Sequence, residues 1–522
     1  MRPDVLYVGS TPQYFVDNHV IEMFNFVTRT MHRPTPHECN PLIRKDRPWE
    51  VVLYFRTNTW NVYWDDQETL YKCWYEDLAY DFDTFSGRKS DTHGLEAPGF
   101  HEVCDSRYLY AESADGVHWE KPELGYRDVD GRRTNICLGN ERDGKAHAAS
   151  FLLDEMEEDP SKRFKVIFWN ERKDLADAIN KVGYSPDGRT WTLSDEPVTF
   201  GGNSGRGTGD VIIVNRNRQT GEYTMDTRIA HMCEHPGGWS NPDVPGWGLP
   251  IHPNEPTRNA RRRIYYAYSR DFHDWTPPQQ IMTPDLVEDN LDDEYYGLAR
   301  FRLGDLWVGL LNRFHRTPNT MSASLVYSRD GSNWHHAGQR QPFLAPRVDD
   351  PNAWDRYMAE CCCQPVFLDD EIRVYHAGSN FHHDWWQFGF QEQMDHPEAK
   401  AGPASGETAL GLATLRPGGF VSLDSDEREG ILITRPLASR GGELQANVQC
   451  RNDGFFRVAL LDVQGNELSG YEKSACDTFA GDSTGHVVTW GGRSALPAEA
   501  MSRGVKVCFY SRRASLYSFR IV

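Results

Sequence analysis

The sequence predicts an all-β fold, a five-bladed β-propeller followed by a C-terminal β-sandwich, and three observations support this class. A short phrase, Ser-x-Asp-x-x-x-Trp, recurs four times between runs of β-forming residues. Paired extended segments repeat five times before residue 425, and shorter alternating segments follow. Helical periodicity is scarce throughout the chain. Repeated antiparallel units of this size are typical of propeller blades.

The recurring phrase is a hairpin signal. Its four copies occupy residues 113–119, 185–191, 269–275 and 328–334. Three of them place Gly directly after Asp, and Asp-Gly between two β-forming runs is typical of a tight antiparallel turn. We therefore expect one such turn in each of the first four blades.

The five blades are predicted from pairs of extended segments joined by an acidic or glycine-containing turn. The fifth unit lacks the phrase and is expected to end in a hairpin of residues 410–415 with 420–423. Residues 1–45 are expected to be a lead-in, so the predicted propeller domain covers residues 1–425. The five pairs are 60–66 with 70–76, 149–154 with 163–169, 210–214 with 222–228, 296–301 with 306–311, and 364–368 with 371–375.

After residue 425 the pattern changes to short alternating segments separated by turn residues. Several short strands of this kind over about a hundred residues are typical of a β-sandwich. The predicted second domain covers residues 426–522. Its expected strands are 443–448, 456–461, 486–490, 505–510 and 516–521.

The composition limits the classes of partner. A net charge of −20 argues against nucleic acid, because phosphate binding needs clustered Lys and Arg. No apolar run approaches the length of a membrane span, and no apolar leader opens the chain. The eleven cysteines follow no zinc or disulfide spacing, so we expect free thiols in the cytoplasm. A homo-oligomer is left open.

The chemistry is expected at the mouth of the propeller, where first-strand starts and second-strand ends meet. Asp210, Glu294 and Glu360 stand at first-strand starts of blades three, four and five. Glycoside hydrolysis uses facing carboxyl groups, one protonated as general acid and another acting as base or nucleophile. Crowding like charges raises the pKa of one carboxyl group and so provides the acid. These three are the predicted catalytic residues.

Other polar and aromatic side chains at the same mouth are predicted to bind the substrate. Arginines can pair with an anionic sugar, histidines can bind hydroxyls or shuttle protons, and aromatic rings can stack on sugars. The predicted substrate-binding residues are Trp60, His147, Arg228, His231, Arg313, His315, Tyr357, His376 and His383.

A metal site is the alternative for the histidines. His231, His315 and His376 recur at second-strand ends, and residues 382–384 read His-His-Asp. Together they could hold a divalent metal, although their spacing matches no short metal motif. We therefore predict no cofactor and leave the metal open.

Several segments carry a resemblance to a known group of enzymes. They are residues 15–17, 70–75, 110–122 and 419–423. The layout resembles the five-bladed propeller glycoside hydrolases with a C-terminal β-sandwich, the invertase-like and arabinanase-like enzymes. It is more closely similar to bacterial proteins that resemble the N-terminal domain of glycosyl hydrolase family 32. The resemblance implies this fold and a glycosidase activity on an oligo- or polysaccharide.

The departures from the invertase pattern limit that implication. Invertase-like enzymes carry acidic motifs on blades one, two and three, whereas this chain has Thr-Asn-Thr-Trp at 57–60 and His-Ala-Ala at 147–149. Glu360 followed by Cys361 is similar to the acid motif of those enzymes, but it lies on blade five. Fructosidase activity is therefore not carried over.

These inferences together predict a glycoside hydrolase with its site in the axial pocket. Glu294 or Glu360 is the expected general acid, and Asp210 the expected base or nucleophile. Two alternatives stay open at this point. One is a propeller lyase that uses His, Tyr and Arg, with or without a metal, and the other is a propeller that binds carbohydrate without turning it over.

Overall fold

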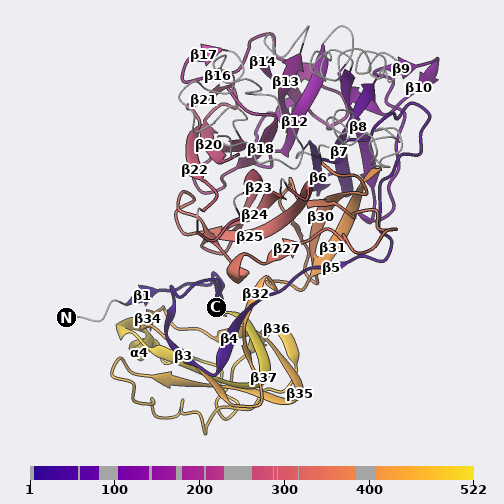
Figure 1. The fold of residues 1–522 in the computed structure, drawn as a ribbon. Helices are drawn as coiled ribbons and strands as arrows, with labels where there is room; N and C mark the ends of the chain where they lie inside the picture. The colour runs from indigo at the N-terminus through magenta and orange to yellow at the C-terminus, as the bar shows by residue number, and fades with distance from the viewer. Residues whose placement is uncertain are drawn as a thin grey trace.

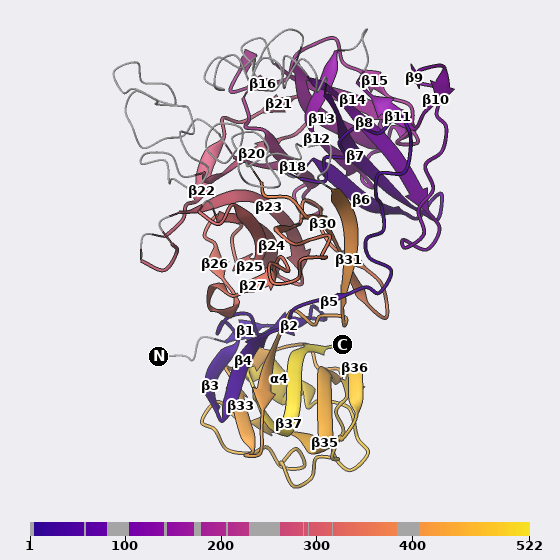
Figure 2. The ribbon, with the colours of Figure 1, turned by 45° about the vertical axis from the view of Figure 1, so that its right-hand side comes forward.

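The computed structural model describes residues 5–56, 59–80, 104–139, 144–171, 179–204, 207–228, 262–285, 287–290, 292–315, 317–383 and 407–522. Over these ranges the chain is almost entirely β-structure, with one α-helix, α4 (Ala498–Arg503). The larger of two bodies is built from the middle of the chain, and the smaller from both ends (Figures 1 and 2). No helix in the described ranges has the length and apolarity needed to cross a membrane.

The larger body is a five-bladed β-propeller, as predicted. In each blade the main strands follow one another outward from an inner strand and pair antiparallel. The first blade contains β6 (Trp60–Asp65), β7 (Leu70–Tyr80), β8 (Cys104–Ser113) and β11 (Ile136–Leu138), and the second contains β12 (Lys145–Leu153), β13 (Phe164–Glu171), β14 (Ile179–Ser185) and β15 (Thr192–Leu193). The third contains β18 (Val211–Arg216), β19 (Tyr223–Arg228), β20 (Ile264–Ser269), β21 (Asp274–Trp275) and β22 (Gln279–Met282), joined by β16 (Thr199–Phe200) and β17 (Asn203–Ser204).

Blades four and five are linked by one parallel contact. Met321 of the fourth pairs with Met358 of the fifth. The fourth blade contains β23 (Asp293–Leu303), β24 (Leu306–His315), β25 (Thr320–Ser328), β26 (His335–His336) and β27 (Pro342–Leu344). The fifth contains β28 (Met358–Glu360), β29 (Val366–Phe367), β30 (Ile372–Ser379), β31 (Thr408–Leu415) and β5 (Thr35–Pro36).

The ring closes through the N-terminal segment. Thr35 and Pro36 of β5 pair with Thr414 and Ala413 of β31, which makes a segment from before blade one the outer strand of blade five. A further bridge joins Ile43 to the same strand. Residues 35–43, within the segment expected to be only a lead-in, therefore complete the propeller.

The smaller body is a β-sandwich, and its boundaries differ from the prediction. Its main sheet runs β3 (Ile21–Asn25), β33 (Gly430–Thr434), β37 (Lys506–Ile521), β32 (Val421–Ser425) and β4 (Val27–Met31). β35 (Leu444–Leu461), β36 (Asp482–Val487) and β2 (Gln13–Tyr14) extend it, and β1 (Leu6–Tyr7) pairs with β34 (Leu437–Ala438).

Two expectations about the domain boundary are corrected by this pairing. β32 pairs with β37 and β4 in the sandwich rather than with β31, so the hairpin predicted to end blade five does not form. The predicted boundary at residue 425 therefore falls at the end of a sandwich strand. The N-terminal segment contributes to both bodies, and Asp17 ties them together through its carboxylate, which accepts from Arg329 Nε and Nη2 at 2.9 and 2.8 Å.

The four Ser-x-Asp-x-x-x-Trp phrases form the same turn after the third strand of blades one to four. In the second copy Ser185 Oγ accepts from the Gly188 N–H at 2.8 Å. Asp187 Oδ1 accepts from the N–H groups of Arg189 and Thr190 at 2.8 and 2.9 Å. The same bonds recur at Asp115, Asp271 and Asp330. The predicted hairpin is thus a side-chain-capped turn.

Two of these turns also bind the preceding blade around the ring. The Gly188 carbonyl accepts from Trp74 Nε1 at 2.7 Å, and the Asp187 carbonyl accepts from Lys72 Nζ at 2.8 Å, which joins blade two to blade one. The Gly116 carbonyl accepts from the Tyr375 hydroxyl at 2.9 Å, which joins blade one to blade five. The phrase therefore has an architectural role.

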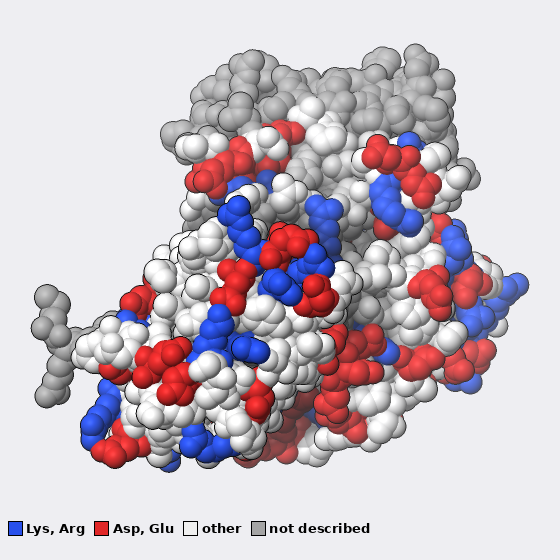
Figure 3. Space-filling model, turned by 90° about the horizontal axis from the view of Figure 1, so that it is seen from below, with Lys and Arg blue, Asp and Glu red and all other residues white. Residues whose placement is uncertain are grey.

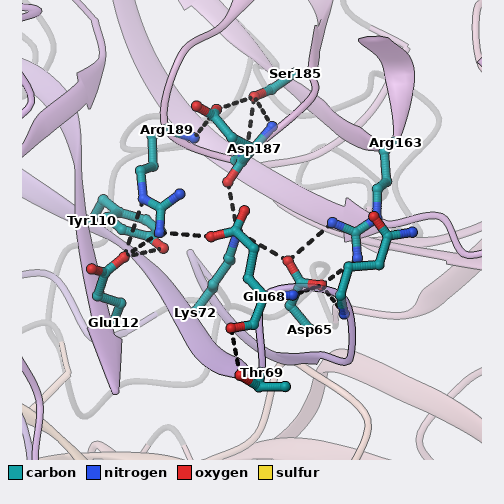
Figure 4. A network of polar contacts seen from close by, with 12 residues as sticks. Asp65, Glu68, Thr69, Lys72, Tyr110, Glu112, Arg163, Ser185, Asp187 and Arg189 are labelled. Atoms are coloured by element: carbon teal, nitrogen blue, oxygen red, sulfur yellow. Dashed lines mark hydrogen bonds and ion pairs between the residues drawn. The ribbon is translucent and has the colours of Figure 1, made fainter. Parts of the chain in front are cut away.

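A buried ionic network holds blades one and two together (Figure 4). The carboxylate of Asp65, at the end of β6, lies 3.0 Å from Lys72 Nζ and is also bound by Arg163 of blade two. Lys72 donates to Glu68 at 2.7 Å, and Arg189 joins Glu68 at 2.9 Å. Because Asp65 and Lys72 have no exposed side-chain surface, each charge depends on its partners.

The exposed side chains of the smaller body mix both signs of charge. Seen from below, acidic and basic groups are interspersed over the described surface (Figure 3). Arg513 pairs with Glu427 and Asp453, and Lys506 pairs with Glu22. The described part of this view has no broad basic patch of the kind that binds nucleic acid.

The capped turns predict a stability effect. Asp187→Ala removes the acceptor of two backbone N–H groups, so we expect the free energy of unfolding to fall by about 1 to 2 kcal/mol. Urea denaturation followed by tryptophan fluorescence measures it. Asp195→Ala, at an exposed aspartate nearby, is the matched control. Equal midpoints for the two variants would contradict the architectural role.

The ionic network predicts a pH effect. Burial alone raises the pKa of Asp65, but Arg163 and Lys72 outweigh it and lower the pKa from 3.8 to about 2. The ionised carboxylate therefore stabilises the fold above pH 3.8, and this contribution of about 2 kcal/mol disappears as the pH falls toward 2. We expect the stability gap between wild type and Asp65→Asn to shrink between pH 7 and pH 3. Asp66→Asn, at an exposed neighbour, is the matched control. A gap of the same size for both variants would contradict the role of the buried network.

Candidate active site

The candidate site is organised around the ring of Tyr296 on the inner strand of blade four. The guanidinium carbon of Arg228 lies 3.7 Å from the ring centroid, and that of Arg262 lies 5.2 Å from it. The ring of His383 packs against the same ring at 5.0 Å between centroids. These side chains come from the end of β19, the residues before β20, and the segment after β30. One aromatic ring thus gathers residues of blades three, four and five.

Asp210 precedes β18 and is held by Arg228 at the end of the neighbouring strand. Arg228 Nε donates to Asp210 Oδ1 at 2.7 Å, and Nη2 also contacts the carboxylate. Burial by itself raises the pKa of Asp210, but the charges of Arg228, Arg262 and His147 hold it well below its usual range. With 28% of its side chain exposed, Asp210 is an ionised carboxylate that a ligand can reach.

Glu294 is the second carboxylate of the cluster. It lies on β23 and forms a salt bridge with Arg262. The Glu294 side chain is only 3% exposed, whereas Arg262 is 23% exposed. Arg262 also lies over the ring of Phe314, which is directly opposite Glu294 in the β23–β24 ladder. Asp210 and Glu294 are therefore each bound to an arginine that packs on Tyr296.

Glu360 ends β28, the inner strand of blade five. It has no exposed surface and stands opposite Ala377 of β30. The next residue, Cys361, is tied to β24 by both groups of the Asn312 amide, at 2.9 and 2.7 Å. Burial raises the pKa of the Cys361 thiol well above its usual value. Glu360 is thus fixed against blade four, which carries Glu294.

His147 stands at the start of β12 and is held by a carboxylate. Its Nδ1 lies 2.6 Å from Glu76 Oε1, and its ring meets the edge of Trp169 at 5.9 Å between centroids. The charge of His147 contributes to the low pKa of Asp210. Blade two therefore adds an imidazole to the same mouth.

His383 is held in place from both sides. Its ring packs on Phe314 at 4.6 Å, and its backbone carbonyl accepts from Arg56 of the segment before blade one. His382 beside it stacks on Tyr357 at 3.7 Å. The segment after β30 thereby contributes His383 to the cluster around Tyr296, and Tyr357 lies behind it.

Arg313 and His315 lie on the other face of their strand. They stand opposite Tyr295 and Asp293, whereas Phe314 between them faces Glu294. Arg313 Nη2 contacts Asp293 at 2.5 Å. Both ring nitrogens of His315 are used, with Asp293 Oδ1 at 2.6 Å and Ser322 Oγ at 2.8 Å. The structure does not bring these two residues to the Tyr296 ring, because strand alternation turns them away.

Two further predicted substrate-binding residues lie apart from the cluster. Glu360 stands opposite Ala377, so the side chain of the preceding residue, His376, points to the other face of the sheet. The His376 ring packs on Trp354 at 5.4 Å between centroids. Trp60 has no exposed surface and packs against Phe55 at 6.3 Å. In these positions both side chains support the scaffold rather than offer a surface to a sugar.

Some expectations fall outside the described residues. His231 and Asp384 belong to this group, so the predicted metal set is described only in part. Within the described ranges, no group of three or more His, Cys, Asp and Glu side chains is placed to hold a metal ion. His315, His376 and His383 have the separate surroundings given above.

The sequence reasoning missed Arg262 and Tyr296. Arg262 precedes the third strand of blade three, and third strands start at the same mouth where second strands end. Tyr296 lies at a bulge of the β23–β24 ladder, between Tyr295 and Gly297. Extending the search to third-strand starts would have found the arginine, whereas a bulge has no simple signal in a single sequence.

No family model and no curated protein matches the chain. A β-1,2-mannobiose phosphorylase from Listeria innocua, solved with β-1,2-mannobiose, is 12% identical over 74% of this chain and 97% of that one, with a TM-score of 0.46. A glycosyl hydrolase from Bacteroides ovatus is 13% identical over 74% and 94%, with a TM-score of 0.42. An N-acetylgalactosamine deacetylase from F. plautii, solved with blood group B trisaccharide, is 12% identical over 79% and 95%, with a TM-score of 0.40. At these values no activity and no residue role is transferred to this chain.

The buried ion pairs of Arg313 in blade four predict that this residue contributes to folding stability. Arg313 contacts the carboxylates of Asp289 and Asp293, and both have fully buried side chains. Arg313→Gln should lower the free energy of unfolding by about 3 to 5 kcal/mol, because it leaves buried charges short of a partner. Arg347→Gln, at a half-exposed arginine paired with Asp355, is the control and should cost far less in urea denaturation. Similar losses for both would contradict the buried placement.

Proposed function

We propose that the protein is a carbohydrate-active enzyme, and specifically a glycoside hydrolase. One observation carries the proposal. Asp210 and Glu294, at inner-strand starts of neighbouring blades, are held by two arginines that pack on the single ring of Tyr296. Carboxyl groups brought to one mouth by a rigid scaffold are what hydrolysis of a glycosidic bond requires.

The surroundings of the three carboxyl groups suggest different roles. Asp210 is ionised and partly exposed, which suits a base or nucleophile. Burial disfavours the charged form of a carboxyl group, so the fully buried Glu360 suits the general acid better than Glu294, which is paired with Arg262. Glu294 would then hold Arg262 in position beside the substrate.

In the proposed reaction Glu360 gives its proton to the leaving oxygen as the bond from that oxygen to the anomeric carbon breaks. Asp210 either bonds to the anomeric carbon or takes a proton from the water that attacks it. In the first case water later releases the sugar and returns the proton to Glu360. The proposed substrate is an oligo- or polysaccharide, and its hydroxyls would meet Arg262, His147 and His383.

A second candidate is favoured by the arginines themselves. Two guanidinium groups over Tyr296 are suited to neutralise the carboxylate of a uronic acid, next to a Tyr or His that removes a proton. This would be elimination by a polysaccharide lyase. Its product carries a new carbon–carbon double bond that absorbs in the ultraviolet, and a hydrolysis product does not.

Cleavage of a panel of aryl glycosides and of neutral and acidic polysaccharides tests the proposal. Asp210→Asn and Glu294→Gln remove one charge each with little change in shape. We expect Asp210→Asn to lower kcat by roughly 10²- to 10⁴-fold, and the product to show no ultraviolet absorbance. Glu294→Gln should act mainly through Arg262 and lower kcat/KM by a smaller factor.

The control is Asp370→Asn, an exposed acid in the β29–β30 turn. It should keep wild-type activity. Full activity of Asp210→Asn would overturn the carboxylate mechanism, and an ultraviolet-absorbing product from an acidic polysaccharide would favour the lyase. Binding of sugars with no turnover of any panel member would indicate a carbohydrate-binding propeller.

A further inference from the structure

We infer that Glu76 is a positioning residue that, with Ser106 and Tyr108, fixes His147 as a substrate-contacting group beside Asp210. The inference rests on the proposed function only for where the substrate lies. It gives His147 of blade two a defined role in the site and adds a buried shell behind it from blade one.

Glu76 is a buried carboxylate that two hydroxyl groups hold against one imidazole. It lies on β7 with no exposed surface. Its Oε1 accepts from Ser106 Oγ at 2.7 Å and meets His147 Nδ1 at 2.6 Å. Its Oε2 is 3.3 Å from the Tyr108 hydroxyl. Oε1 is therefore placed against the imidazole, and Oε2 is held by Tyr108, before any ligand arrives.

The Tyr108 hydroxyl links the carboxylate to the backbone beside His147. It accepts from the Ala149 N–H at 2.6 Å, so its own hydrogen is directed to Glu76. A buried phenol in this position connects β8 of blade one to β12 of blade two. The shell behind His147 thus fixes both the ring and the strand that carries it.

The backbone next to His147 is strained. Ala148 has a φ of 51°, in the left-handed region that residues other than glycine rarely adopt. The β12–β13 ladder breaks its register between His147 and Ser150. A bulge re-aims a side chain, and strain of this kind persists where the surroundings hold it, which is common at functional sites.

The bond to Glu76 decides which ring nitrogen of His147 carries the hydrogen. Both oxygens of Glu76 accept from hydroxyls, Oε1 from Ser106 and Oε2 from Tyr108, so Nδ1 carries the hydrogen and donates it to Glu76. In the neutral ring Nε2 is an acceptor, and it would take a hydrogen bond from a sugar hydroxyl at the mouth that also holds Asp210. The bond from Nδ1 to Glu76 strengthens Nε2 as an acceptor.

Four variants test this arrangement in the full-length protein. Glu76→Ala removes the acceptor, and Glu76→Gln keeps an acceptor without the charge. His147→Asn removes the ring and identifies its nuclear magnetic resonance signals by their loss. Asp77→Asn is the matched control, because Asp77 is the next residue on β7, equally buried, and bonds to Arg107 instead.

Two readouts separate positioning from folding. The ring-nitrogen spectrum should show His147 protonated at Nδ1 in wild type and in Asp77→Asn, and a mixture of tautomers in Glu76→Ala. On the panel member that wild type cleaves best, Glu76→Ala should lower kcat/KM roughly 10- to 100-fold, and Glu76→Gln should recover most of it. Melting temperatures of all variants are compared with Asp77→Asn.

The inference is overturned if Nδ1 of His147 carries no proton in wild type. It is also overturned if Glu76→Ala and Asp77→Asn lose activity equally, in step with their melting temperatures. If wild type cleaves no panel member, the proposed function fails, while the ring-nitrogen spectra still decide whether Glu76 positions His147.

Discussion

The site depends on a ring that is closed without a covalent bond. The two residues of β5 supply the outer strand of blade five. The Gly116 carbonyl, in the turn of blade one, accepts from the Tyr375 hydroxyl of blade five. The candidate site uses residues at or next to the inner strands of blades two, three, four and five, so it exists only while the ring is closed. A loss of closure would therefore disperse the carboxylates as well as unfold an edge.

Charge is the second constraint on this ring. Several blade contacts bury ion pairs rather than apolar rings alone, as with Asp65, Lys72 and Arg163 between blades one and two. Asp226 and Arg300 form the corresponding contact between blades three and four. Buried pairs add little net stability, but breaking one leaves an uncompensated charge, so each fixes which blade lies beside which. The packing of neighbouring blades then sets where the starts of their inner strands lie at the mouth of the propeller.

Local signals were sufficient to predict the fold, whereas pairing between distant segments was not. Alternating runs and the Asp-Gly turns are properties of a few consecutive residues, and they correctly indicated the propeller and the sandwich. β5 is two residues long, and its partner lies more than 370 positions away in the chain, so no local pattern marks it. β32 reads like the second arm of a hairpin, but it joins the sandwich because β37 and β4 flank it there.

The sequence also leaves open which side chains near the strand ends face the candidate site. Asp210 and Arg228 lie together because they flank one antiparallel pair, whereas Arg313, His315 and His376 lie away from the Tyr296 ring on the other face of their strands. In a strand, one residue of offset turns a side chain through the sheet, and a single sequence does not fix that offset. Phe314, between the two predicted residues, is the one that faces Glu294. Near strand ends, residue type indicates that polar chemistry is present, and register decides which residues perform it.

The two arginines place positive charge beside both carboxylates of the site. Arg228 and Arg262 both pack on Tyr296, and both act on the charge of Asp210. Arg228 is almost fully buried, whereas Arg262 keeps part of its surface exposed, so a ligand would reach Arg262 first. A ligand oxygen that binds Arg262 competes with Glu294 for the same guanidinium. Arg228 is too buried to be drawn away from Asp210 in the same way. The charge that keeps Asp210 ionised would therefore remain while a ligand occupies Arg262, whether the bond is broken by hydrolysis or by elimination.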